Sequence, residues 1–464
     1  MMNRATKILK QVWKPFYFSM RNLAYPDAFT QYLENLSDTN YSKLENGLTI
    51  ATEERSCANA CVALVLDAGS RYENNHENGM IHFFEHIAFK GTNARSRNEL
   101  ETQMSSIGAK FRCFTTREMV VYCVECLSED TPAAVDLLAD CVFSNAYSPK
   151  VIQRQKPIVY TEMLMLDKNP KAVVFDYLHS TAFQGTPLAQ SVIGPSCNLN
   201  TFTDTTLCKY LSKRLDPCRT VLAAVGKIKH EDMVHLADSF LGNLEPLRCS
   251  SKDAYRYTGS DVRFRDDSMP TAHVLVAVEG PCFTHQDSIV MEVARHIVGG
   301  WDRSQPGGQG HAVRVARNAS GGMFCDSYQA FNITYKDCGL WGVHFLSDVM
   351  SLDDMMMLIQ NEFMYLCLYV TGPELERAKN FLKTMILSQM ESSLRSCLDI
   401  GRWTLYSGCR PSLTQKMSAI DSITVDQMRT VCKRYLYDRC PVVAAVGPIE
   451  GLLPYARIRS YMWS

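Results

Sequence analysis

Near the middle of the chain stands the stretch TVLAAVGKI, residues 220–228, and a close copy, PVVAAVGPI, stands at residues 441–449. Gly226 and Gly447 lie 221 positions apart, and Thr203 and Thr424, which precede the two stretches, lie at the same offset. Each stretch is a short apolar run with β-branched residues that ends at a glycine, which predicts a buried strand. Two matches at one offset predict two duplicated domains of about that length.

The front ends of the two halves match more loosely. A predicted strand at residues 62–69 is followed by a helix from about Gly79, and a strand at 274–280 is followed by a helix at 288–298. Strands alternating with helices predict the α/β class, here α+β sandwich domains with mixed sheets packed by helices. The length of 464 residues also suggests at least two domains.

The domain boundaries follow from composition. Residues 248–262 are polar at their start and lack a helical or strand period, so we interpret them as a linker. The first domain then spans residues 27–247 and the second residues 263–464.

A candidate metal site lies in the first half, in the sequence His82-Phe83-Phe84-Glu85-His86. Two imidazoles four positions apart share one face of a helix, and the carboxylate lies beside them. This pattern is typical of two zinc ligands with an adjacent general base. The alternative is an ordinary helix with two partly exposed histidines and an acid.

A third ligand is needed, because a catalytic zinc site has three protein ligands and an open position for water. The run at residues 158–166 is apolar and carries a single charged group, Glu162. Burying a lone carboxylate is costly unless it is paired or bound to a metal. Without the histidine pair, Glu162 would be interpreted as an exposed helix residue; with it, we predict the third ligand.

With these residues in place, the chain resembles the M16 (pitrilysin-type) metallopeptidases. The distal glutamate lies 76 positions after His86, and the neighbourhood HFFEHIAFKGT at residues 82–92 resembles the subfamily that holds mitochondrial processing peptidase β subunits and cytochrome bc1 core 1 proteins. The resemblance runs from about residue 40 to the end. It implies two domains packed as one subunit and Zn²⁺ as the cofactor. Pairing Gly69 with Gly280 puts apolar residues at both imidazole positions of the second domain, which should bind no zinc.

The resemblance also implies roles for three substrate-binding residues. Phe89 matches an aromatic residue that lines the pocket after the scissile bond, Asp176 an acid that contacts a substrate arginine, and Tyr335 a tyrosine that reaches the substrate carbonyl. Each has a structural alternative: Phe89 as a core residue, Asp176 as a surface acid of a helix, and Tyr335 as a packed strand residue.

Three positions depart from the family pattern. A glutamate beside the metal ligands is Gln155 here, which supplies no charge. A second arginine-binding acid is Ala172, which has no carboxylate to pair with a guanidinium. The edge strand that pairs with substrate reads Arg112-Cys113 in place of Asn-Ala. A cation there disfavours pairing with an extended basic peptide. The sequence therefore predicts intact zinc ligation and altered substrate recognition.

Composition narrows the location and the partners. The formal net charge is −1, so nothing favours nucleic acid or an anionic membrane surface, and no apolar run approaches the roughly 20 residues that span a bilayer. Residues 1–26 contain five basic residues and no acid, which is typical of a mitochondrial transit peptide; the alternative is a basic arm. The 18 cysteines are scattered, which favours free thiols in a reducing matrix.

Three functions remain open from the sequence. The first is a zinc metalloendopeptidase, the β-type subunit of a mitochondrial processing peptidase, which cleaves presequence peptides together with a noncatalytic α-type subunit in a heterodimer. The alternative is a noncatalytic core 1-type subunit among other bc1 subunits, on the matrix face of the inner membrane. A paralogue with a narrowed substrate range is a third alternative.

Overall fold

The computed structural model describes residues 37–247 and 255–463. The predicted transit peptide at residues 1–26 lies outside the described residues, as does part of the predicted linker. Within the described residues, no helix combines the length and the apolar character that crossing a membrane requires.

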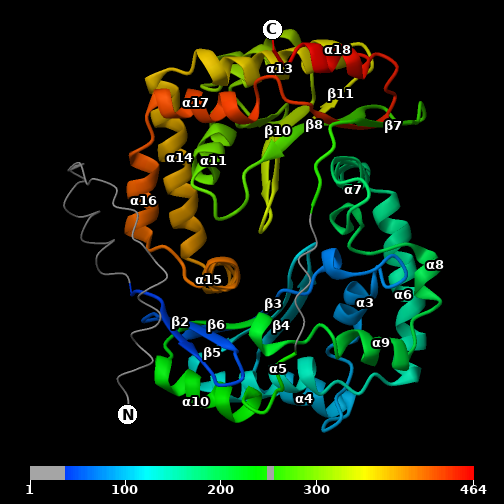
Figure 1. Cartoon of the computed structure of the whole chain (residues 1–464), viewed down its shortest axis with the longest axis vertical. Coiled ribbons are helices and arrows are strands. Elements are labelled where there is room, and N and C mark those ends of the chain that lie inside the picture. The colour runs from blue at the N-terminus through cyan, green and yellow to red at the C-terminus, as the bar shows by residue number, and fades with distance from the viewer. Residues whose placement is uncertain (1–36, 248–254, 464) are drawn as a thin grey trace. The chain divides into compact units, whose positions relative to one another are not determined.

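The first sheet has six strands and lies in the first half of the chain (Figure 1). β2 and β6 run parallel, and the other neighbours run antiparallel. In spatial order the strands are β1 (Asn40–Lys43), β2 (Thr49–Glu54), β6 (Thr220–Gly226), β3 (Asn59–Leu66), β5 (Val120–Leu127) and β4 (Lys110–Thr115).

The second sheet repeats this arrangement in the second half. β12 and β7 run parallel, and the other neighbours run antiparallel. In spatial order the strands are β7 (Asp261–Arg265), β12 (Val442–Gly447), β8 (Ala272–Gly280), β11 (Gly339–Ser347), β10 (Ser327–Thr334) and β9 (Gly300–Asp302). The repeated stretches at residues 220–228 and 441–449 form β6 and β12, which occupy equivalent places beside β3 and β8, so the predicted duplication and the α/β class are confirmed.

Helices flank both sheets. Those of the first half are α3 (Met80–Ile87), α4 (Arg97–Ser106), α5 (Thr131–Phe143), α6 (Pro149–Asp167), α7 (Pro170–Ala182), α8 (Ser196–Leu199), α9 (Asp204–Leu211) and α10 (His230–Leu241). Those of the second half are α11 (Asp287–Val298), α12 (Arg314–Gly322), α13 (Leu352–Leu368), α14 (Gly372–Met390), α15 (Ser393–Ser407), α16 (Leu413–Asp421), α17 (Val425–Tyr435) and α18 (Tyr455–Ser460).

Each sheet is covered on one face by a helix from the other half of the sequence. α15 packs on β3 and β6 of the first sheet, and α7 packs on β12 and β8 of the second. The contact between α15 and the first sheet is close because residue 401 is a glycine. A Cβ at Gly401 would lie 2.5 Å from the Val65 side chain. The sequence places α7 inside the first predicted domain, but its apolar face is buried in the core of the second sheet.

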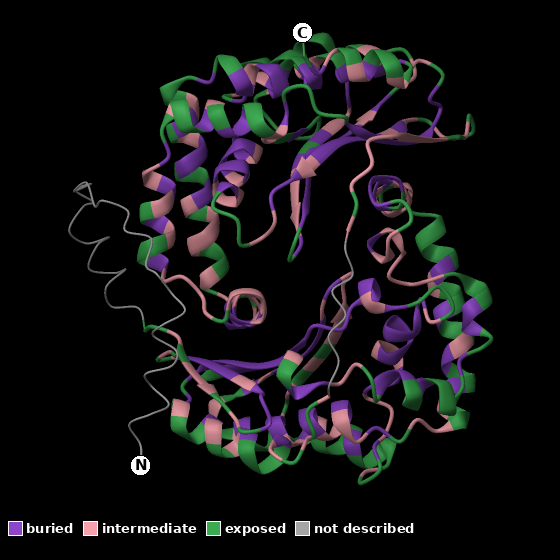
Figure 2. Cartoon of the chain, viewed as in Figure 1, coloured by how far each residue is buried: buried purple, intermediate pink, exposed green. Residues whose placement is uncertain are grey.

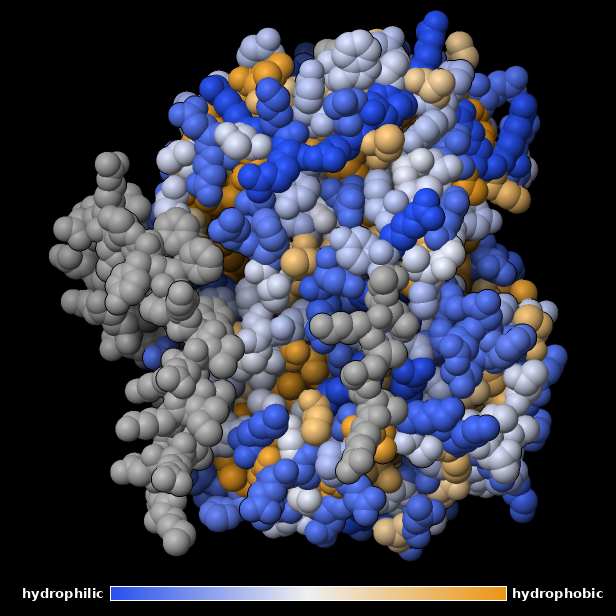
Figure 3. All heavy atoms as spheres, in the orientation of Figure 1, coloured by the Kyte–Doolittle hydropathy of each residue, from blue (hydrophilic) through white to orange (hydrophobic). Residues whose placement is uncertain are grey.

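Burial follows the sheets. Central strands such as β3, β6, β8 and β12 are purple through most of their length in Figure 2, while the outer faces of the helices are green. On the face drawn in Figure 3, apolar side chains reach the surface in small groups between polar ones. Cys123 and Cys126 of β5 lie in different apolar cores, on opposite faces of the sheet, as the strand period predicts. All cysteines of the described residues are free thiols.

Candidate active site

Helix α3 carries the histidine pair, and a buried acid holds its first turn. The helix follows Gly79, which has a positive φ of 93° and offers no capping side chain. The Glu73 carboxylate caps the helix from the preceding loop. It accepts hydrogen bonds from the backbone N–H of Gly79 at 2.9 Å and of Ile81 at 2.7 Å. Burial raises the pKa of Glu73 to about 7, against these hydrogen bonds, which lower it.

Sequence analysis missed Glu73. The available signal was a helix start at a glycine with no Ser, Thr, Asp or Asn at the cap, which requires another acceptor for the first N–H groups. The role of Glu73 is to fix the direction in which α3 presents its side chains.

The three predicted metal ligands converge. Glu162 Oε2 on α6 lies 3.2 Å from His82 Nε2 and 2.9 Å from His86 Nε2, and the two Nε2 atoms are 3.3 Å apart. Two zinc ligands at bond lengths near 2.05 Å in a tetrahedral site are about 3.3 Å apart. The three atoms therefore form a triangle of the size that one face of such a tetrahedron requires, and among the described residues this is the group suited to a metal ion.

The position of Glu162 is set by helix packing, since α6 packs against α3. The apolar run around it is largely exposed: Ile158 is 51% and Met165 66% accessible, and the Glu162 side chain is 38% accessible. The cost of burying a lone acid in an apolar run therefore does not explain this residue. Within the run, only Val159 and Met163 are buried against the core. Glu162 lies between them in the sequence, and its side chain reaches the two histidines of α3.

The two histidines differ in their electrostatic surroundings. Burial lowers the pKa of His82, but the hydrogen bond to Glu85 and the charges of Glu162 and Glu85 outweigh it, so the net shift is upward. For His86, burial and the neighbouring His82 together bring the pKa below its ordinary value, although Glu162 and Glu85 oppose this. The pair thus carries one imidazole that readily stays neutral, the form that binds a metal.

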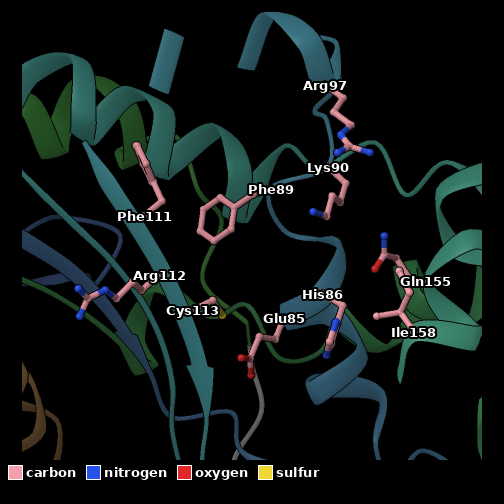
Figure 4. A pocket seen from close by; sticks show the side chains of 10 residues that line it. All are labelled: Glu85, His86, Phe89, Lys90, Arg97, Phe111, Arg112, Cys113, Gln155 and Ile158. Atoms are coloured by element: carbon pink, nitrogen blue, oxygen red, sulfur yellow. The ribbon is translucent and has the colours of Figure 1, made fainter. Parts of the chain in front are cut away.

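A pocket of about 470 Å³ opens beside Glu85 and His86 (Figure 4). Glu85 Oε2 lies 3.6 Å from His82 Nδ1, and its side chain is partly accessible, so it reaches both the ligand group and the pocket. Phe89 lies on the opposite wall, with its ring 5.7 Å from that of Phe111 in an edge-to-face arrangement. Glu85 and Phe89 are therefore brought together with the candidate ligands.

Asp176 and Tyr335 do not line this pocket. Asp176 on α7 accepts hydrogen bonds from Arg117 through Oδ1 and from the Ser191 hydroxyl, at 2.9 Å, through Oδ2. Tyr335, in the turn between β10 and β11, is 8% accessible, and its hydroxyl lies 2.8 Å from His179 Nε2. Both residues are engaged within the chain.

The three departures from the family pattern lie around the site in different ways. Gln155 on α6 is buried and lines the pocket. Ala172 lies in the first turn of α7, where its N–H donates to Asn169. Arg112 lies on β4 and forms an ion pair of 3.2 Å with Glu125, and Figure 4 shows its guanidinium directed away from Phe89 and Glu85.

Comparison with known proteins assigns the family. The model of insulinase (peptidase family M16) matches residues 49–196, and that of the peptidase M16 inactive domain matches residues 201–382. The chain belongs to peptidase family M16. The two matches follow one another along the chain, and the first contains His82, His86 and Glu162.

Two groups of M16 relatives are similar to the chain over nearly its whole length. Cytochrome b-c1 complex subunit 1, mitochondrial, of Mus musculus is 42% identical over 94% of this chain and 92% of its own length. Mitochondrial-processing peptidase subunit beta of Homo sapiens is 38% identical over 97% of this chain and 92% of its own length. A chain of the structure titled Complex III2 from Candida albicans, Inz-5 bound, has the same fold, with a TM-score of 0.83 at 24% identity, over 92% of this chain and all of that one.

Proposed function

We propose that this M16 chain is a zinc-dependent endopeptidase, the β-type subunit of a mitochondrial processing peptidase that cleaves N-terminal presequences. The observation that carries the proposal is the triangle of His82 Nε2, His86 Nε2 and Glu162 Oε2 beside Glu85. A chain that had lost catalysis would have no chemical need to keep all four groups in this geometry.

The chemistry divides between the metal and this chain. Zinc at the triangle would act as a Lewis acid on a peptide carbonyl and bring the pKa of a water molecule toward about 7. Glu85, 3.6 Å from His82 and open to the pocket, accepts the proton of the attacking water and passes it to the leaving amine. His82, His86 and Glu162 serve as ligands, and Phe89 lines the pocket for the residue after the scissile bond.

The partners and location follow from the same likeness. A β-type subunit works as a heterodimer with a noncatalytic α-type subunit in the mitochondrial matrix, and residues 1–26 would serve as its transit peptide. Asp176 would contact a substrate arginine and Tyr335 the substrate carbonyl only after exchanging their present partners, Arg117 and His179. Binding of an arginine-containing presequence through these two residues therefore requires that both contacts within the chain be broken.

The test compares the wild type with Glu85→Gln. The full chain is purified with its α-type partner and without chelator, zinc is measured by elemental analysis, and cleavage of a presequence peptide is followed by mass spectrometry. We expect about one zinc per chain in both proteins and turnover only in the wild type. Glu129→Gln, which changes an exposed glutamate away from the site, is the matched control. Equal inactivity of well-folded wild type and variant overturns the enzyme assignment.

A second function has its own support. The ion pair of Asp176 with Arg117, the alanine at 172 and the cation at 112 all weaken presequence binding, and the similarity to bc1 subunit 1 is as extensive as that to the processing peptidase. A core 1-type structural subunit on the matrix face of the inner membrane fits these features. Recovery of the tagged chain with bc1 subunits at equal stoichiometry and without zinc supports this alternative; recovery with an α-type subunit alone contradicts it.

A further inference from the structure

The pocket beside Glu85 combines an aromatic wall with cationic groups. Phe89 and Phe111 form the wall, and Ile158 adds an apolar surface from α6. Among the described residues that line the pocket, Glu85 is the sole carboxylate, whereas Lys90 and Arg97 both bring positive charge. Figure 4 shows these two side chains on the same side of the pocket, beyond Phe89.

These two cations are available to a ligand. Within the described part of the chain, Lys90 has no carboxylate partner. Arg97 donates through Nε to Glu101 at 2.8 Å, but both side chains of this pair are 50% accessible, and exposed pairs of this kind contribute little stability. The two terminal nitrogens of Arg97 remain for a second acceptor. Arg112 does not join them, because its guanidinium faces away toward Glu125.

The pocket lies on the Glu85 and His86 side of the candidate site. Its lining contains Glu85 and His86 but neither Glu162 nor His82. Because the base that activates water also delivers the proton to the leaving amine, the residue that carries this amine lies next to Glu85. A side chain of that residue therefore enters the pocket between the phenylalanines and the two cations.

We propose that this pocket selects an acidic residue, glutamate or aspartate, immediately after the scissile bond. The side-chain methylenes lie against the Phe89 and Phe111 rings, and the carboxylate pairs with Lys90 and Arg97. This inference rests on the proposed peptidase function, since it names the substrate class of that site. With this preference, the chain cleaves peptide bonds that are followed by an acidic residue. Lysine or arginine at the same position is disfavoured.

The first arm of the test measures binding and needs no turnover. Zinc-loaded full-length Glu85→Gln is titrated with labelled ten-residue peptides, otherwise uncharged, in which one position is Glu, Gln, Phe or Lys. We expect the glutamate peptide to bind about tenfold more tightly than the glutamine peptide, as one charge-assisted contact provides. The preference should weaken as salt rises. Equal binding of the two peptides, or tighter binding of the lysine peptide, overturns the proposal.

Pocket variants assign the preference to the two cations. Lys90→Gln combined with Arg97→Gln should bring the ratio of the two affinities close to one, while Arg154→Gln, which removes an exposed cation from α6 outside the pocket, should leave it unchanged. Lys90→Glu should reverse the order and favour the lysine peptide. A ratio that survives the double variant overturns the assignment.

The second arm separates this inference from the peptidase proposal. The wild type is incubated with a mixed peptide library, and the residues after each cut are read by mass spectrometry. Enrichment of Glu and Asp after the cut supports the inference, and random or aromatic residues there contradict it. If no cut occurs while the tenfold binding preference holds in the first arm, the peptidase function fails and the acid-selective pocket stands.

Discussion

The Glu73 carboxylate accepts a hydrogen bond from the backbone N–H of Ile81 at 2.7 Å, one residue before the first candidate zinc ligand. Its second oxygen accepts from Gly79, so the acid satisfies two N–H groups at the start of α3. The loop before the helix is therefore part of the machinery that aims His82 and His86.

Removing this acceptor should loosen the helix. We expect Glu73→Ala to lower the free energy of unfolding by about 1–3 kcal/mol at pH 5, because buried N–H groups lose their partner. Zinc affinity should fall with it, since the ligands on α3 are no longer held in one orientation. Chemical denaturation and zinc titration measure the two effects. Glu77→Gln, in the same loop but bonded at the surface to Asn74, is the control and should change neither.

Glu73 also makes stability depend on pH. Its pKa is about 7 in the folded chain against an ordinary 4.5, so between these values the folded state holds a proton that the unfolded state releases. Stability from this group is therefore highest below about pH 4.5 and falls as pH rises to 7, by about 3 kcal/mol at about 1.4 kcal/mol per pKa unit. The difference in unfolding free energy between the wild type and Glu73→Gln should shrink over this range. A difference that stays constant contradicts the assignment.

The buried Glu118 carboxylate connects residues of both halves. Glu118 accepts from Arg71 at 2.7 Å, from the Tyr406 hydroxyl at 2.6 Å and from the Lys336 N–H at 3.0 Å. Glu118→Ala leaves the buried Arg71 with one fewer counter-charge, and we expect a loss of about 3 kcal/mol in the free energy of unfolding. Denaturation by urea measures it. Glu125→Ala, which removes a partly exposed acid from the next strand, should cost less than about 1 kcal/mol.

We expect the glutamine at position 155 to weaken zinc binding relative to a glutamate. Gln155 is buried beside the pocket, where a carboxylate would add negative charge near the ligands. We expect Gln155→Glu to tighten zinc binding by about tenfold or more, as outer carboxylates do in other metal sites. Competition with a zinc-binding dye measures the dissociation constant. Gln153→Glu, at an exposed position of the same helix, is the matched control; an equal gain in that variant would show that the effect is only long-range charge.

The Arg117–Asp176 pair blocks an acid that could bind substrate arginine. Asp176 Oδ1 is occupied by Arg117, so we expect Arg117→Gln to strengthen binding of an arginine-containing presequence peptide several-fold by freeing this oxygen. Fluorescence anisotropy with zinc-loaded Glu85→Gln gives the affinity. Adding Asp176→Asn should abolish the gain. Unchanged affinity in Arg117→Gln would mean that Asp176 has no part in substrate binding.

The chain sequence by itself determined the duplication and the α/β class, and it predicted the three side chains that the structure brings together as candidate metal ligands. Residues 220–228 and 441–449 carry their own periodicity, and the helical spacing of His82 and His86 places both imidazoles on one face; such patterns are local and need no knowledge of the rest of the fold. The tertiary structure alone decided the rest. Helices α7 and α15 bury their apolar faces on sheets of the opposite half. Arg117 and His179 contact Asp176 and Tyr335, which are far away in sequence. These contacts depend on which surfaces meet when the chain closes, because hydrophobic burial and ion pairing select neighbours in space and leave no fixed spacing along the sequence.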